Sequence, residues 1–110
     1  ACARGRTTVA NCLAQVDTRT GAVLTWAGAE GRGEELLGEP AVVVPPVGST
    51  VGPREPRAAL LVGAHGTTGS SLAVLDAETM REVARCRVPA GAAGIPPALP
   101  YSLHGEWLPA

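Results

Sequence analysis

The stretch Leu72-Ala73-Val74-Leu75-Asp76-Ala77-Glu78-Thr79 decides the fold, because the chain carries an earlier copy of it. That copy, Leu13-Ala14-Gln15-Val16-Asp17-Thr18-Arg19-Thr20, lies 59 residues upstream and keeps the Leu, Ala, Asp and Thr positions. In each copy a short apolar run leads into Asp-x-x-Thr, where the Asp side chain can bond the backbone two residues on. Each copy therefore predicts a strand, a tight turn and a returning strand.

Two further apolar runs, at 39–45 and 58–64, lie between the copies. Neither run alternates with polar residues, which favours strands that are covered on both faces. Four prolines between them, over 45–56, predict a long irregular loop. Together with hairpins at 11–26 and 71–88, these runs give four antiparallel strands that repeat once, as β-propeller blades do. The alternative is a chance similarity between two ordinary hairpins. We expect an all-β fold of antiparallel blades, of which this chain supplies about one and a half.

The composition excludes several classes of function. The chain has 110 residues, enough for one domain, and 9 basic and 10 acidic side chains give a net charge of −1. This charge argues against the strongly basic face of a nucleic-acid-binding protein. The longest apolar runs fall far short of the roughly 20 residues of a transmembrane helix. Three widely spaced cysteines predict reduced thiols in an intracellular protein, in the cytosol or a plastid.

Few side chains are candidates for chemistry. His104 precedes Gly105, which lets other groups approach the imidazole closely, although a lone histidine is more often a structural hydrogen-bonding group. Glu39 begins an apolar strand and is either solvated or held by a partner. His65 is interpreted as an exposed loop residue. Three further acidic residues are interpreted as plain loop charges: Glu30, Glu34 and Glu35.

Five segments, in order, resemble the C-terminal end of the carotenoid oxygenases. This family comprises carotenoid-cleaving, apocarotenoid and stilbene-cleaving dioxygenases, with the retinoid isomerase as a relative. The matching segments are 13–26, with Val16-Asp17-Thr18-Arg19-Thr20-Gly21; 38–45, with Gly38-Glu39-Pro40; 71–79; 83–89; and 101–107, with Leu103-His104-Gly105. We therefore assign residues 11–110 to the C-terminal blades of such a propeller and residues 1–10 to a lead that does not match.

The resemblance implies a seven-bladed propeller with Fe(II) on its axis, held by four histidines. His104 maps onto the last of these ligands, and Glu39 maps onto a glutamate that accepts the other ring N–H of such a histidine. The three other ligand-bearing segments lie upstream in the family and are not in this sequence. The implied partners are O2 and a carotenoid or apocarotenoid, with membrane contact only through regions outside this chain.

Two positions depart from the family pattern, since Leu103 replaces an aromatic residue and Glu106 replaces a small one. The chain does not begin with Met, which predicts a processed or partial product. We expect the parent protein to be a non-haem iron dioxygenase that cleaves C=C bonds, and the isolated chain to be inactive. The alternative is a non-catalytic propeller that serves as a scaffold or interaction module, with His104 in a structural role.

Overall fold

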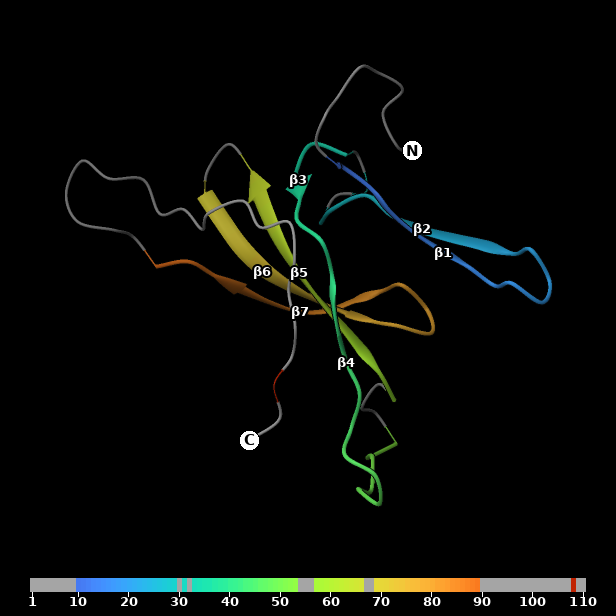
Figure 1. Cartoon of the computed structure of the whole chain (residues 1–110). Helices are drawn as coiled ribbons and strands as arrows, with labels where there is room; N and C mark the ends of the chain where they lie inside the picture. The colour runs from blue at the N-terminus through green and yellow to red at the C-terminus, as the bar shows by residue number, and fades with distance from the viewer. Residues whose placement is uncertain are drawn as a thin grey trace.

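The computed structural model describes residues 10–29, 31, 33–53, 57–66, 69–89 and 108. These residues form strands and no helix, so the predicted all-β class is confirmed (Figure 1). The strands are β1 (Leu13–Val16), β2 (Val23–Trp26), β3 (Leu36–Leu37), β4 (Ala41–Val43), β5 (Ala59–Gly66), β6 (Gly69–Asp76) and β7 (Glu82–Arg87). Among these described residues, no helix is long and apolar enough to cross a membrane.

The larger sheet is antiparallel, with the strand order β3-β5-β6-β7, and β4 also pairs with β5. Leu37 lies opposite Ala64, and Ala41 lies opposite Leu61, so β3 and β4 occupy the same edge of β5. Between these pairs, residues 38–40 are one residue longer than the stretch of β5 that faces them, which makes them a bulge. β3 and β4 are therefore two halves of one interrupted strand. The sheet has the four-strand width that the sequence predicts for a blade.

The centre of this sheet is the β5–β6 hairpin. Its pairing runs without a register shift from Ala59 opposite Asp76 to Gly66 opposite Gly69. Both strands extend further toward the connecting turn than the sequence indicated. β7 pairs with the other edge of β6, with a register shift between Val74 and Leu75.

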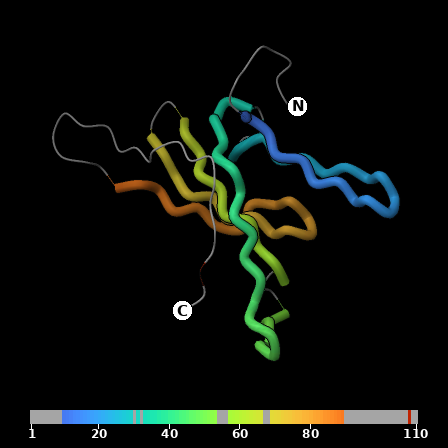
Figure 2. Tube along the Cα trace, viewed as in Figure 1, coloured from blue at the N-terminus to red at the C-terminus, as the bar shows by residue number. Residues whose placement is uncertain are grey.

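The β1–β2 hairpin forms a separate two-stranded sheet that projects away from the blade (Figure 2). Trp26 of β2 belongs to the buried apolar cluster and Leu13 of β1 packs against it. Two side-chain hydrogen bonds also join this hairpin and the residues before it to neighbouring segments. Gln15 Nε2 donates a hydrogen bond to the carbonyl oxygen of Ala77 in the β6–β7 turn. Asn11 Nδ2 donates to the carbonyl oxygen of Gly33 at 3.1 Å.

The two copies of the repeat form the same turn. Asp17 Oδ1 accepts the backbone N–H groups two and three residues on, at 2.8 and 3.2 Å, and Asp76 Oδ1 does so at 2.8 and 3.3 Å. The turns then close through a residue with positive φ, Gly21 at 75° and Met80 at 56°. This agreement in detail supports a true structural repeat over a chance similarity of sequence.

Met80 takes the position of the turn glycine because its side chain completes the core. It is 4% exposed, although a bulky residue at positive φ is strained. The buried apolar cluster consists of Trp26, Leu37, Val62, Ala64, Ala73, Leu75 and Met80. Alternate residues of β5 and β6 face this cluster, while intervening residues such as Leu61 and Val74 are half-buried.

The cysteines differ from the expectation of three reduced thiols. Cys12 is disulfide-bonded, so that expectation is wrong at this position. Cys86, on β7, is a free and exposed thiol. Sequence spacing is a poor guide to pairing because a disulfide depends on the distance between the Cα atoms in the fold.

Replacing Met80 by Gly should destabilise the protein although it relieves the positive φ. Loss of the buried side chain costs about 2–5 kcal/mol, whereas the conformational relief is worth about 1 kcal/mol. The matched change at the other turn, Gly21→Ala, meets no atom within 4 Å and should cost only the strain, about 1 kcal/mol. Urea unfolding of both variants measures these losses. A Met80→Gly variant as stable as the parent would contradict the role of Met80 in the core.

Candidate functional site

Glu39 lies in the bulge between β3 and β4, at one edge of the blade. Pro40 has no N–H to donate to the ladder, so regular pairing stops there. Before the bulge, the backbone N–H of Gly38 donates to the carbonyl oxygen of Gly63 at 2.9 Å. The bulge takes the exposed side chain of Glu39 out of the regular alternation of the strand.

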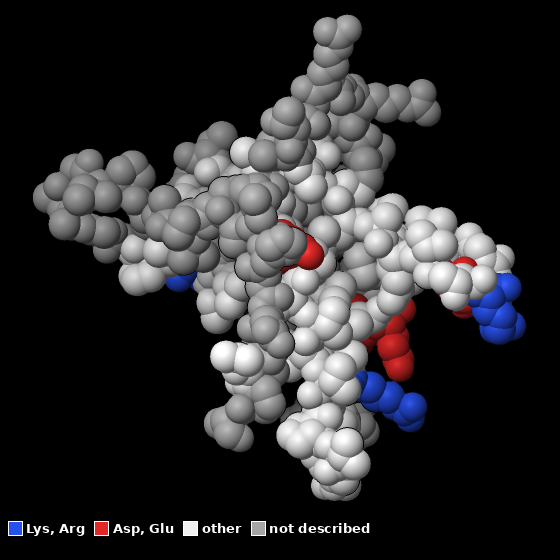
Figure 3. Space-filling view, in the orientation of Figure 1, with Lys and Arg blue, Asp and Glu red and all other residues white. Residues whose placement is uncertain are grey.

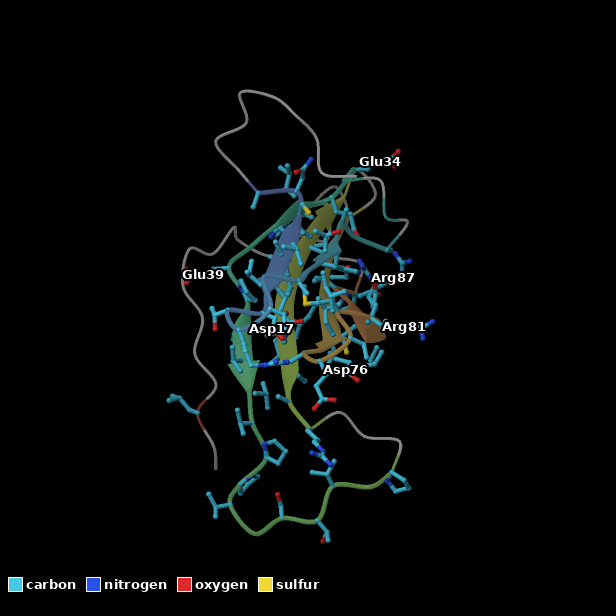
Figure 4. All side chains as sticks on the ribbon, turned by 90° about the vertical axis from the view of Figure 1, so that its right-hand side faces the viewer. Asp17, Glu34, Glu39, Asp76, Arg81 and Arg87 are labelled. Carbon is cyan, nitrogen blue, oxygen red and sulfur yellow. The ribbon has the colours of Figure 1, made fainter. Side chains whose placement is uncertain are left out.

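The two edges of the blade differ in character. The edge that carries Glu39 is formed by the apolar residues of β3 and β4. The opposite edge, β7, carries Glu82, Arg85 and Arg87, and Arg81 precedes it. Charged side chains are typical of a strand edge that faces water, because they discourage pairing with another strand. Figure 4 shows Glu39 on one side of the sheet and Arg81 and Arg87 on the other. The apolar edge is therefore the one suited to packing beside further protein.

The other predicted site residue, His104, lies outside the described residues, so its pairing with Glu39 stays a prediction. In the described part of the chain, no group of three or more His, Cys, Asp or Glu side chains could hold a metal ion. Figure 3 shows acidic and basic side chains at scattered points on this face of the described surface. They form no patch of a single sign there, in keeping with the net charge of −1.

His65 is a strand residue, and the expectation of an exposed loop histidine is wrong. It lies half-buried in β5, directly opposite Ser70 on β6. Its Nδ1 is 3.0 Å from Ser70 Oγ. The two strands continue past the position where the sequence predicted a turn, and this places the imidazole within the sheet.

Arg85 is the centre of a polar cluster that sequence reasoning did not find. Its guanidinium donates to both carboxylate oxygens of Glu35, at 2.7 and 3.1 Å. It also donates to both oxygens of Glu82, at 2.6 and 3.0 Å, and to Ser71 Oγ at 2.7 Å. Side-chain exposures of 13% for Arg85 and 19% for Glu35 show that this ion pair is largely shielded from solvent. The interpretation of Glu35 as a plain loop charge is therefore wrong.

Glu35 also binds the loop that follows β2. Its Oε1 accepts the backbone N–H of Ala29 at 2.9 Å. Next to it, Gly28 has a φ of 85°, and a Cβ there would lie 2.7 Å from Glu35 Oε1. The backbone conformation favours glycine at this position, and a Cβ there would also displace the carboxylate of Glu35.

The surroundings shift the pKa values of both partners. Burial raises the pKa of Glu35, but hydrogen bonds from Arg85 and Ala29, together with the charges of Arg85 and Arg87, outweigh it and hold this pKa below 4.5. The hydrogen bond to Glu82 is the largest of the causes that raise the pKa of Arg85 above its ordinary value. The pair is therefore ionised at neutral pH, with the two glutamates sharing one guanidinium.

A family model described as "Retinal pigment epithelial membrane protein" matches residues 1–109. The chain belongs to the carotenoid oxygenase and retinoid isomerase family. No curated protein and no solved structure matches the chain significantly. The resemblance found in the sequence is thus confirmed for the family. The boundary that we placed after residue 10 stays a prediction.

The carotenoid oxygenases are an enzyme family known for an iron cofactor. In this member, the Gly38-Glu39-Pro40 segment of the resemblance forms the bulge on the apolar edge of the blade. The Arg85 cluster has no clear signal in the sequence, because Glu35 and Arg85 are 50 residues apart. Glu82 and Arg85 are three residues apart, a spacing that places side chains on opposite faces of a regular strand. The register shift between β6 and β7 brings them to one face, opposite Leu75 and Ala73, so this ion pair also has no signal in the sequence.

In this protein, Glu35→Gln should lower stability at neutral pH by about 1–3 kcal/mol, because charge-assisted hydrogen bonds to Arg85 are lost. A carboxyl group with a lowered native pKa stabilises the fold above its unfolded pKa, and that stability is lost as the pH falls through the native value. The difference between parent and variant should therefore shrink below pH 4.5. Urea unfolding at pH values from about 3 to 7, which span the ordinary carboxyl range, measures this difference in stability. The exposed Glu34→Gln is the control, and a pH-independent difference would contradict the assignment.

Proposed function

We propose that this protein is a non-haem Fe(II) dioxygenase that cleaves C=C bonds of carotenoids or apocarotenoids with O2. In this proposal His104 is one of the iron ligands. Glu39 accepts the other ring N–H of His104 and so holds the imidazole in one tautomer and orientation. The family match over residues 1–109 carries the proposal, together with the bulge that takes Glu39 out of the strand alternation.

The donor chemistry fits an iron site. Neutral imidazole nitrogen is a ligand that Fe(II) accepts, and a carboxylate oxygen is a common partner of the remaining ring N–H. Glu39 provides such an oxygen at the apolar edge, on the side of the sheet opposite Arg81 and Arg87 (Figure 4). When bound, Fe(II) would supply the redox chemistry with O2. The chain's own contribution is to orient the imidazole through Glu39.

The apolar character of this edge suits the proposed substrate class. Ala41 and Val43 follow Glu39 on β4 and are half-buried. Apolar side chains of this kind provide the surface that a hydrocarbon polyene needs for binding.

The alternative function is a non-catalytic propeller that binds another protein. The observation that favours it is the apolar surface of β4 and the following loop, where Val42, Val44 and Val47 are 58%, 64% and 107% exposed. Iron content separates the two functions, since a scaffold needs no metal.

In the iron-loaded full-length protein, His104→Ala should abolish iron occupancy because a ligand is lost. Glu39→Gln should keep the fold and lower turnover about 10–100-fold, the usual effect of losing the partner of a metal-bound histidine. Metal analysis and carotenoid cleavage under O2 are the measurements, with the exposed Glu34→Gln as control. Normal iron content in the His104 variant would exclude this residue as a ligand. Unchanged turnover in the Glu39 variant would exclude the role of the glutamate.

The isolated 110-residue chain should not retain stoichiometric Fe(II), because it contains 2 histidines in all. Two imidazoles are fewer than the four that the family resemblance implies for this centre. Dialysis of the purified chain against anaerobic Fe(II), then against buffer, followed by metal analysis, provides the test. One equivalent of tightly bound iron would show that this stretch of chain forms a complete site.

A further inference from the structure

The position of the Arg85–Glu35 ion pair relative to the blade is the starting observation. Arg85 belongs to β7, the charged edge strand, whereas Glu35 directly precedes β3 at the apolar edge. β5 and β6 lie between these two strands in the sheet order. The ion pair therefore links the two edges of the blade across its full width. Arg85 also donates a hydrogen bond to Ser71 Oγ of β6, the strand next to β7.

Neutralising Arg85 does not require Glu35. Glu82, three residues away, already binds the guanidinium through both carboxylate oxygens. A second carboxylate from a distant segment adds the cost of desolvating another charge and is not needed to balance the charge of Arg85. The consequence specific to Glu35 is geometric, because its carboxylate fixes where the chain enters β3.

β3 is short and consists of Leu36 and Leu37. Leu37 is fully buried in the core, whereas Leu36 is 41% exposed, so Glu35 adds a polar anchor on the side where the core does not cover the strand. Beyond it the chain enters the bulge, where pairing with β5 is interrupted, and Glu39 lies four residues after Glu35. If the residues that lead into β3 were displaced, the bulge and the carboxylate of Glu39 would be displaced as well.

We propose that the Arg85–Glu35 ion pair positions Glu39 for its hydrogen bond to the iron-bound histidine. This inference rests on the proposed function of Glu39. In this role Glu35 and Arg85 are positioning residues that touch neither the metal nor the substrate. Glu82 binds the same guanidinium from within β7, and among the described residues its carboxylate forms hydrogen bonds to Arg85 alone.

The structure offers a matched pair of variants, Glu35→Gln and Glu82→Gln. Each removes one carboxylate from the same guanidinium, and only the first releases the entry to β3. In the iron-loaded full-length protein, Glu35→Gln should speed iron loss to a chelator and lower turnover, each about 3- to 10-fold. Glu82→Gln should leave both within about twofold of the parent. Both measurements are made below the melting temperature of every variant, and Glu35→Asp replaces Glu35→Gln if that variant does not fold.

A double variant connects the effect to Glu39. In a Glu39→Gln background, Glu35→Gln should produce little further loss, because the group that it positions has already been removed. If Glu35→Gln and Glu82→Gln behave alike, or if the losses at residues 35 and 39 multiply, the ion pair is only structural and this inference is wrong. If Glu39→Gln alone changes neither iron release nor turnover, the proposed function of Glu39 is wrong, and the inference falls with it.

Discussion

The antiparallel pairing of β5 with β6 is the constraint on which the rest of the structure depends. This ladder runs unbroken from Ala59 opposite Asp76 to Gly66 opposite Gly69, and it contributes most of the buried apolar cluster. One edge of the ladder accepts β3 and β4, and the other accepts β7. Because side chains alternate along paired strands, this register decides which residues enter the core and which face outward. The register of the hairpin therefore sets the place of both the bulge and the Arg85 cluster.

The internal repeat places the same type of Asp turn in two different environments. Both turns use an Asp side chain to accept successive backbone N–H groups and a residue at positive φ to close the loop. In the projecting hairpin that residue is Gly21, which has open space around it. In the blade it is Met80, whose side chain fills the core despite the backbone strain. Burial of an apolar side chain outweighs a conformational preference where the two compete.

The polar features of the blade are divided between its two edges. The charged edge, β7, carries Arg85, which is held by Glu82 and by Glu35. The apolar edge carries Glu39 in a bulge. The ion pair through Glu35, which also binds the loop after β2, connects the two edges directly. In the role that we propose for it, this ion pair positions Glu39 from contacts made at the far side of the sheet.

The sequence alone determined the all-β class, the two Asp turns, the four-strand blade and the family. Each of these features follows from local sequence patterns or from motifs that occur in a fixed order. Tertiary structure decided what depends on distant partners. It showed that β3 and β4 share one edge of β5, that His65 lies within the sheet, and that Glu35 binds Arg85 from 50 residues away. The sequence also pointed to Glu39 through its Gly-Glu-Pro segment, but only the strand register revealed the bulge that carries it. Local propensity is encoded residue by residue, whereas the match between a charge and its partner exists only once the strands have paired.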